Sequence, residues 1–286
     1  MNIAQDSAVQ ALLTLALEED LPKGDVTSEG CIDATTRSKG AFITREPCVV
    51  AGLEVAAAVF ARLDAGVLFT PAVKEGSFAP AQTTLAYVEG PARALLSGER
   101  TALNFMQRLC GVASNARRYA EAVAHTKCRI VDTRKTTPGW RRLEKYAAQL
   151  GGARNHRADL SSGILIKDNH IVAAGSITNA IERAKAHASH LLKVECEVTD
   201  LKGLLEAIEA GADIILLDNM KPEQIKEAVQ LAEQHKKGPT RVLLEASGGI
   251  NLQNIAGYAE AGADIISSGA ITHSARAIDI GLDFLE

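Results

Sequence analysis

Two identical seven-residue segments constrain the fold of this chain more than any other feature. The segment EAGADII occurs at residues 209–215 and again at 260–266, 51 residues apart. In each copy a helical stretch ends at a glycine and an apolar strand follows. An interval of this length accommodates two strand–helix units, which is the spacing expected of a (β/α) barrel. Two unrelated helix-to-strand turns are the alternative explanation.

Six short apolar segments beyond residue 128 alternate with helical patterns. They are CRIVDTRK, ILIKDN, LLKVECEV, DIILLDNM, RVLLEASGG and DIISSGA. Such alternation predicts a parallel sheet whose strands are joined by crossover helices. Residues 38–90 instead contain short strands around one helix near 53–63, and a long helical run extends from Ala92 to about His125. We therefore expect an α/β protein with two regions, the second of which is the barrel.

Charge is unevenly distributed along the chain. The formal net charge of −4 over 286 residues argues against binding to nucleic acid or to an anionic membrane surface. Residues 134–167 nevertheless contain eight lysines and arginines against two acidic residues. A cationic segment in an acidic chain predicts a pocket for a small anionic ligand.

The cysteines and the N-terminus indicate the cellular compartment. The five cysteines are far apart and include no C-x-x-C pair, so neither a disulfide framework nor a zinc site is expected. Residues 1–21 carry acidic side chains where a signal peptide has lysines, and no apolar run reaches membrane-spanning length. These features predict a cytoplasmic protein.

Polar side chains gather where the expected barrel strands end. The loops that follow the strands line the functional face of such a barrel. Glu195 and Glu197 alternate along one strand, so both side chains face the same side. The other polar strand ends are Thr133, Arg134, Lys135, Lys167 and Asp218. A lone acid at a strand end is more often a helix cap than a ligand, but this many at one face predict a functional site.

Small residues end the last two strands, as SGG at 247–249 and SSGA at 267–270. Loops of small residues let backbone N–H groups approach a phosphate, and the next helix N-terminus adds a favourable partial charge. The expected phosphate contacts are Ser247, Gly248, Gly249, Ser268, Gly269 and Ala270. Carboxylates such as Glu197 and Asp218 suit sugar hydroxyls, or a Mg²⁺ ion that bridges phosphate oxygens.

The cations predict a second anion. Arg134 and Arg157 can each grip a carboxylate with two N–H groups, while Lys135 and Lys167 act as point charges. His156 follows the flexible pair at 151–152 and stands beside Arg157, which favours a hydrogen-bonding contact with ligand over a surface histidine.

Neighbouring charged residues receive other interpretations. Asp132 is expected to orient the cations rather than to touch a ligand. The cations after Pro138 are expected on the solvated face of a helix; they are Arg141, Arg142 and Lys145.

Seven longer motifs occur in a fixed order along the chain. They are GDVTS, GERTALNFMQRLCGVAS, DTRKTTPGW, LEKYA, LIKDNHI, AGADIILLDN and SGGI. From about residue 18 onwards, the chain resembles the quinolinate phosphoribosyltransferase family. The resemblance implies an N-terminal α/β sandwich over residues 1–110 and an incomplete parallel (β/α) barrel over 111–275. It also implies that residues 276–286 return to the sandwich.

The same resemblance implies an enzyme of NAD biosynthesis. The family joins quinolinate to 5-phosphoribosyl 1-pyrophosphate in the presence of Mg²⁺ and yields nicotinate mononucleotide, CO₂ and pyrophosphate. It implies a homodimer, or a higher homo-oligomer, in which Arg100 of one subunit reaches the site of the other. The alternatives are a paralogue associated with molybdenum transport that acts on another substrate, and a non-catalytic anion-binding module.

Roles carried over motif by motif divide the site into two sides. The quinolinate side is implied to contain Thr133, Arg134, Lys135, His156, Arg157 and Lys167. The phosphoribosyl side is implied to contain Glu197 with its neighbour Glu195, Asp218 and the Ser-Gly loops. Catalytic roles are implied for Lys135, Glu197 and Asp218.

Overall fold

The computed structural model describes residues 2–236 and 238–285, which divide into two compact units. The first unit contains residues 2–117, 136–152 and 271–285, and the second contains Arg118–Lys135 and Ala153–Ala270. Each unit is therefore built from separate stretches of the chain. The domain boundaries at residues 110 and 275 stay a prediction. Within the described residues, no helix is both long enough and apolar enough to cross a bilayer.

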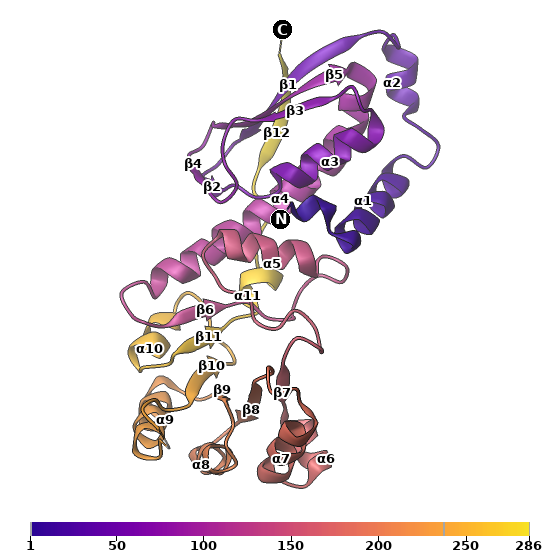
Figure 1. The fold of residues 1–286 in the computed structure, drawn as a ribbon. Coiled ribbons are helices and arrows are strands. Elements are labelled where there is room, and N and C mark those ends of the chain that lie inside the picture. Colours follow the sequence, from indigo (N-terminus) through magenta and orange to yellow (C-terminus); the bar gives the residue numbers. More distant parts are fainter. Residues whose placement is uncertain (1, 237, 286) are drawn as a thin grey trace. The chain divides into compact units, whose positions relative to one another are not determined.

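An antiparallel sheet of four strands is the framework of the first unit. The strand order is β12 (Ile280–Leu285), β1 (Arg37–Thr44), β5 (Thr84–Pro91) and β3 (Leu68–Pro71). The short strands β2 (Cys48–Val49) and β4 (Phe78–Ala79) form a separate pair. Figure 1 shows the yellow strand β12 beside β1, so the end of the chain pairs with a strand formed near its beginning.

Helices and aromatic rings complete the first unit. An edge-on pair joins Phe42 of β1 to Phe60 of α3, with ring centroids 6.0 Å apart, and Phe69 of β3 stacks on Phe60 and lies tilted against Phe42. Such contacts bury large apolar surfaces between the sheet and the helix. The helical elements that lie wholly or mostly in this unit are η1 (Ile3–Gln5), α1 (Ser7–Asp20), α2 (Val26–Cys31), α3 (Leu53–Leu63), α4 (Ala92–Ala122), α5 (Arg141–Leu150) and α11 (Ala270–His273).

The second unit contains a parallel six-stranded sheet, and all six expected strands are confirmed. The order is β6 (Arg129–Val131), β11 (Ile265–Ser267), β10 (Leu243–Ser247), β9 (Ile214–Asp218), β8 (Val194–Val198) and β7 (Ile164–Ile166). The two copies of the repeated segment lead into β9 and β11. Strands β6 and β7 are the two ends of this order, so the barrel is incomplete, as expected.

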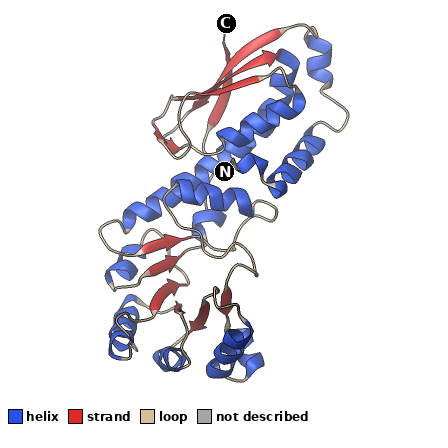
Figure 2. Ribbon diagram, viewed as in Figure 1, coloured by secondary structure: helices blue, strands red, loops and turns tan. Residues whose placement is uncertain are grey.

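Crossover helices connect the parallel strands, as Figure 2 shows in blue beside the red strands. They are α6 (Asp168–Ala174), α7 (Ile177–His187), α8 (Leu201–Glu209), α9 (Pro222–Gln234) and α10 (Ile255–Glu260). Because the strands are parallel, their carboxyl ends meet at one edge. That edge carries the candidate site.

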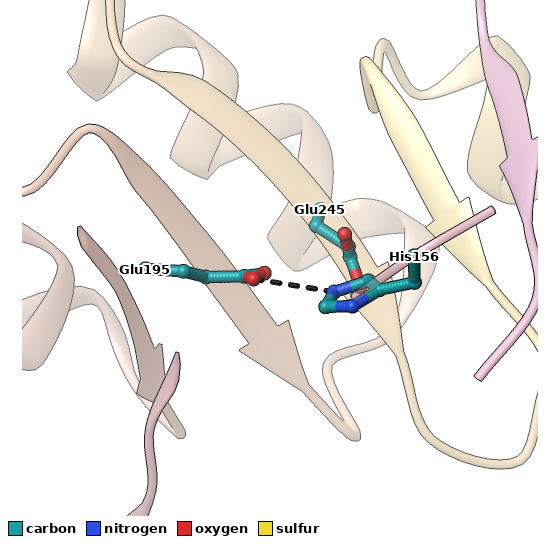
Figure 3. Close-up of side chains that lie close together, drawn as sticks. All are labelled: His156, Glu195 and Glu245. Carbon is teal, nitrogen blue, oxygen red and sulfur yellow. Dashed lines mark ion pairs between the residues drawn. The ribbon is translucent and has the colours of Figure 1, made fainter. Parts of the chain in front are cut away.

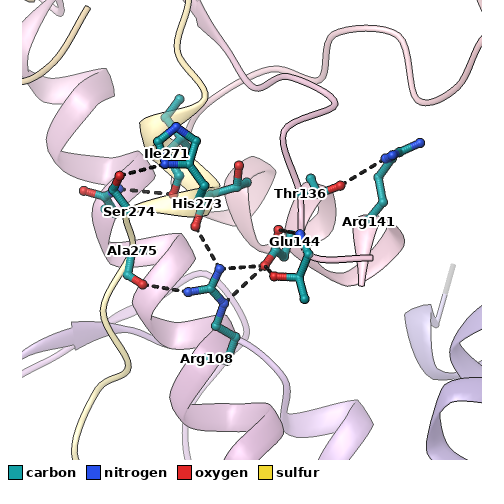
Figure 4. Close-up of polar contacts among 11 residues, drawn as sticks. Arg108, Thr136, Arg141, Glu144, Ile271, His273, Ser274 and Ala275 are labelled. Carbon is teal, nitrogen blue, oxygen red and sulfur yellow. Dashed lines mark hydrogen bonds and ion pairs between the residues drawn. The ribbon is translucent and has the colours of Figure 1, made fainter. Parts of the chain in front are cut away.

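A buried ion pair joins α4, α5 and the C-terminal segment within the first unit (Figure 4). Arg108 Nη2 lies 2.7 Å from Glu144 Oε1, and Glu144 is fully buried. The guanidinium also donates to the carbonyl oxygens of Thr272 and Ala275, and Glu144 accepts the N–H of Thr137. Buried ion pairs need such additional bonds to offset desolvation. The network fixes the turn that follows Arg134 and Lys135 in the chain.

Helix α5 corrects one expectation. Lys145 is only 5% exposed, and Arg141 is half-buried and donates to the hydroxyl of Thr136. Arg142 is exposed and forms an ion pair with Asp6, at 3.6 Å. The expectation of a solvated cationic face is therefore wrong for Lys145, because α5 turns this position towards the interior.

A close approach of two backbones lies at Gly111 in α4. A Cβ atom at this position would lie 1.9 Å from the carbonyl oxygen of Arg276, which is backbone and cannot rotate away. The C-terminal segment therefore packs directly against the helix, and only glycine fits there.

We expect Gly111→Ala to destabilise the protein by about 2 to 3 kcal/mol, since overpacking outweighs the better helix propensity of alanine. The matched control is Gly30→Ala in α2, where an added Cβ would meet no atom within 4 Å. The urea midpoint of unfolding measures both variants. Equal midpoints for the two variants would contradict the close packing described for Gly111.

Candidate active site

Acidic and basic side chains meet at the carboxyl ends of the parallel strands. Lys167, directly after β7, forms an ion pair with Glu197 of the neighbouring strand β8. The lysine side chain is 47% exposed and the glutamate 11%, so the pair opens towards solvent. Asp218 ends β9 and accepts a hydrogen bond from Asn219 Nδ2, at 2.7 Å. The sequence-predicted acids Glu197 and Asp218 thus stand on adjacent strands.

Arg134 and Arg157 lie close enough together to form a cationic centre. Burial lowers the pKa of the Arg157 guanidinium, and the nearby positive charge of Arg134 lowers it further. Arg157 Nη1 donates to the carbonyl oxygen of Gly163, at 3.2 Å. Thr133 shapes the preceding turn, because its hydroxyl accepts the N–H of Lys135 at 3.0 Å. Two arginines held this close favour an anion between or beside them.

Asp132 holds the residues next to Arg157 by hydrogen bonds from the interior. It is fully buried, and Oδ1 accepts the backbone N–H of His156 at 2.8 Å while Oδ2 accepts Asn155 Nδ2 at 2.7 Å. The backbone of Asp132 also bonds to Arg154. Asp132 therefore holds the segment that carries Arg157, which is an indirect way of orienting a cation.

His156 lies against two buried glutamates inside the barrel (Figure 3). Its Nε2 is 3.2 Å from Glu195 Oε2 and 3.6 Å from Glu245 Oε1. The side chains of Glu195 and Glu245 are 7% and 2% exposed. Glu245 belongs to β10, two residues before Ser247, and sequence reasoning missed it. The signal was present, since an acid alternating with Ser247 faces the interior.

The hydrogen bonds of His156 identify its protonated nitrogen. Its Nδ1 accepts the backbone N–H of Arg157 at 2.8 Å, so a neutral ring carries its proton on Nε2, facing the carboxylates. Both ring nitrogens therefore have protein partners. The side chains of His156, Glu195 and Glu245 lie close enough together to be considered as metal ligands. A metal would need the lone pair of Nε2, so this arrangement favours a shared proton over an ion.

The pKa of Glu245 is raised to about 7. Burial is the largest cause, and the negative charge of Glu195 adds to it, while His156 and the hydroxyl of Ser267 act in the opposite direction. Two buried carboxylates that face each other cannot both ionise without cost. Glu245 therefore keeps its proton to a higher pH than an ordinary glutamate does.

The two small-residue loops differ in their details. Gly248 and Gly249 both have positive φ angles, of 93° and 62°. A Cβ at Gly248 would lie 2.3 Å from Asn219 Oδ1, whereas one at Gly249 would meet nothing within 4 Å. Asn219 itself has a φ of 54°, which is uncommon for a residue other than glycine.

The second loop and the first unit hold the remaining predicted contacts. The hydroxyl of Ser268 is buried and donates to the carbonyl oxygen of Ile250 at 2.9 Å, so it ties one loop to the other. Gly269 and Ala270 follow it directly at the start of α11. Arg100 is exposed on α4, within the first unit.

Comparisons with known proteins agree with these features. The model described as quinolinate phosphoribosyl transferase, N-terminal domain, matches residues 25–110, and its C-terminal counterpart matches residues 112–283. The nicotinate-nucleotide pyrophosphorylase (carboxylating) of Mycobacterium leprae is 41% identical over 279 residues, which cover 96% of this chain and 97% of that protein.

Two further similarities extend over nearly the same length. The probable nicotinate-nucleotide pyrophosphorylase (carboxylating) of Synechocystis sp. is 42% identical over 259 residues, covering 90% of this chain and 86% of that protein. The solved structure of nicotinate-nucleotide pyrophosphorylase from Francisella tularensis superposes with a TM-score of 0.92 at 38% identity. It covers 97% of this chain and 96% of that one.

We expect the stability of the wild-type protein to fall relative to Glu245→Gln as pH rises from about 4.5 to about 7. The folded-state pKa of about 7 lies above the ordinary value of 4.5, so the folded state retains a proton that the unfolded chain releases. The full difference corresponds to about 3 kcal/mol, present below this range and lost above it. Urea unfolding at several pH values measures it. Parallel curves for the two proteins would contradict the raised pKa.

Proposed function

Because the chain belongs to the quinolinate phosphoribosyltransferase family, we propose that it transfers the phosphoribosyl group of 5-phosphoribosyl 1-pyrophosphate to quinolinate. The products are nicotinate mononucleotide, CO₂ and pyrophosphate, which makes the protein an enzyme of NAD biosynthesis. One observation of the fold supports this proposal most strongly. Arg134 follows β6, and Arg157 follows Arg154, which forms a parallel bridge to Val131 of β6. Glu197 and Asp218 lie at the carboxyl ends of β8 and β9 in the same parallel sheet.

The cations suit quinolinate, which is a dicarboxylate. Arg157 and Arg134 offset its two charges, and Lys135 and Lys167 add positive potential around it. Thr133 shapes the turn, and His156 keeps Arg157 in place. Held in this way, the substrate can present its ring nitrogen to the sugar in a reactive orientation.

The acids suit the phosphoribosyl substrate. Glu197 and Asp218 accept hydrogen bonds from ribose hydroxyls. Glu195, two residues before Glu197 on the same strand, lies deeper in the barrel and pairs with His156. The backbone around Gly249 and Gly269 meets the phosphate. Carboxylate oxygens at adjacent strand ends also match the preference of Mg²⁺, so Glu197 and Asp218 would hold such an ion through water. When bound there, it would offset negative charge on the leaving pyrophosphate.

The reaction needs little proton transfer from the protein in its first step. The pyridine nitrogen carries no proton, so it attacks C1 of the ribose directly, and the bond from C1 to the pyrophosphate oxygen breaks. Glu197 and Asp218 stabilise the positive charge that develops at C1. The positive charge of Lys135 attracts the two anionic substrates. The ring is then cationic and accepts the electron pair of the breaking carbon–carboxylate bond as CO₂ leaves, after which that carbon takes up a proton.

Two other functions make different predictions for one assay. The protein is incubated with quinolinate, 5-phosphoribosyl 1-pyrophosphate and Mg²⁺, and nicotinate mononucleotide is quantified by chromatography. A paralogue associated with molybdenum transport would leave quinolinate unchanged, and a non-catalytic module would bind phosphate without releasing pyrophosphate. Formation of nicotinate mononucleotide excludes both.

The assembly that we propose is a homodimer in the cytoplasm. Arg100 of one subunit completes the site of its partner, and a higher homo-oligomer can be built from such dimers. The exposed position of Arg100 on α4 supports this role, because an exposed arginine is accessible to another subunit.

We expect Arg157→Ala to weaken quinolinate binding about a hundredfold or more, since the loss of charge-assisted hydrogen bonds costs about 3 kcal/mol or more. Calorimetric titration with quinolinate measures the change. The matched control is Arg154→Ala, an exposed arginine of the same segment, whose affinity should stay near that of the wild type. Unchanged affinity in the Arg157 variant would refute the quinolinate assignment.

The variants Arg100→Ala and Arg157→Ala should each be nearly inactive, but a mixture of the two proteins should regain activity. Random reassociation makes about half of the dimers hybrid, and each hybrid has one intact site of two, so about one quarter of wild-type activity should return. Product formation after mixing measures recovery, and native mass spectrometry confirms the hybrids. Confirmed hybrids without activity would contradict a site shared between subunits.

A further inference from the structure

Glu245 is a buried acid that the reaction described above does not use. It faces the barrel interior from β10, one pleat deeper than Ser247, with 2% of its side chain exposed. Its Oε1 and Glu195 Oε1 are buried and have no hydrogen-bond partner among the described residues. The closest ligand atoms of Glu245, Glu195 and His156 all lie within 4.8 Å of one another. A proton held between the two carboxyl groups would satisfy both buried oxygens.

His156 connects this acid pair to the substrate cations. Its Nε2 faces Glu195 and Glu245, and its Nδ1 accepts the N–H of Arg157 at 2.8 Å. The opposite side of the same segment is held by Asp132. The ring is thus fixed between the acid pair and the backbone of Arg157. A change at Glu245 therefore acts on Arg157 through the ring, without contact with substrate.

We propose that Glu245 is a positioning residue of the quinolinate site: its carboxyl group holds a proton against Glu195 and so keeps His156, and with it Arg157, arranged for a doubly charged anion. This proposal rests on the proposed function, because it takes quinolinate as the ligand of Arg157.

Loss of the proton from Glu245 should oppose the binding of a dianion. The titratable groups that face it are Glu195 from β8 and His156 from the loop before β7, and the thiol of Cys128 before β6 is near enough for its pKa to be raised slightly by the charge of Glu245. Ser267 of β11 adds a hydroxyl. A negative charge on Glu245, next to Glu195 and His156, would reduce the positive potential that attracts the ligand. Both carboxyl groups of quinolinate are ionised above about pH 6, so the ligand itself does not titrate.

The experiment compares the wild type with Glu245→Gln between about pH 6 and about pH 8.5, by steady-state formation of nicotinate mononucleotide. The glutamine amide keeps the size of the protonated acid and can donate to Glu195, but it cannot ionise. As pH rises over this range, we expect the KM for quinolinate to increase about tenfold more in the wild type than in the variant. This is the effect expected of one added negative charge, on Glu245, near the ligand. The KM for 5-phosphoribosyl 1-pyrophosphate should change equally in both proteins.

A second buried acid provides the control. Glu75 is also a mostly buried carboxyl whose pKa is raised by burial, but it caps the N-terminus of α3 by accepting the N–H of Leu53 at 2.6 Å. Glu75→Gln should therefore show the same increase in KM for quinolinate with pH as the wild type.

Glu245→Ala removes the proton donor, so its KM for quinolinate should be high at every pH. If this variant does not fold, the comparison with Glu245→Gln remains the test.

The outcomes separate this proposal from the proposed function. A wild type that makes nicotinate mononucleotide, with the same pH dependence of KM as Glu245→Gln, supports the function and overturns the role of Glu245. If Glu75→Gln also lost the rise in KM for quinolinate with pH, the role proposed for Glu245 would be overturned as well. A wild type that makes no product at any pH overturns both.

Discussion

Negative charge buried behind the cations is the constraint on which the site depends. Arg134 and Arg157 lie close enough for one to lower the pKa of the other, so their positions need support from the protein when no anion is bound. Asp132 and the pair of Glu195 and Glu245 provide it from the interior. Buried acids are costly unless they are hydrogen-bonded or protonated. The backbone N–H of His156 and the side-chain amide of Asn155 donate to Asp132, and a proton lowers the charge of the glutamate pair.

The segment DTRKTTPGW is held at both ends by different buried acids. At its start Asp132 bonds to the chain around His156 in the second unit, and towards its end Thr137 bonds to Glu144 in the first. Glu144 is itself held by Arg108, which also binds the carbonyl oxygens that follow the second small-residue loop. Each end of the segment is thus tied to its own unit by a buried carboxylate.

The sequence predicts the elements of the barrel better than the contacts behind its surface. All six parallel strands, the shared face of Glu195 and Glu197, and the long helix α4 follow from local patterns of apolar residues. Glu245 and Lys145 were missed or misassigned because a charged residue in an apolar stretch can face either solvent or a distant partner. Their burial depends on residues far along the chain, such as His156 for Glu245. Local periodicity holds no information about such partners.

The glycine pair after β10 illustrates the same limit at a finer scale. Sequence reasoning gave Gly248 and Gly249 one purpose, the approach of a phosphate to the backbone. The structure separates them, because a Cβ at Gly248 would collide with Asn219, while a Cβ at Gly249 would point into open space. Gly248 therefore lets β9 and β10 end side by side, with Asn219 in its uncommon backbone conformation next to Asp218. Gly249 has no such neighbour, but its φ of 62° favours glycine by itself, and its contact with a phosphate stays a prediction. The two glycines should therefore differ in what their replacement damages.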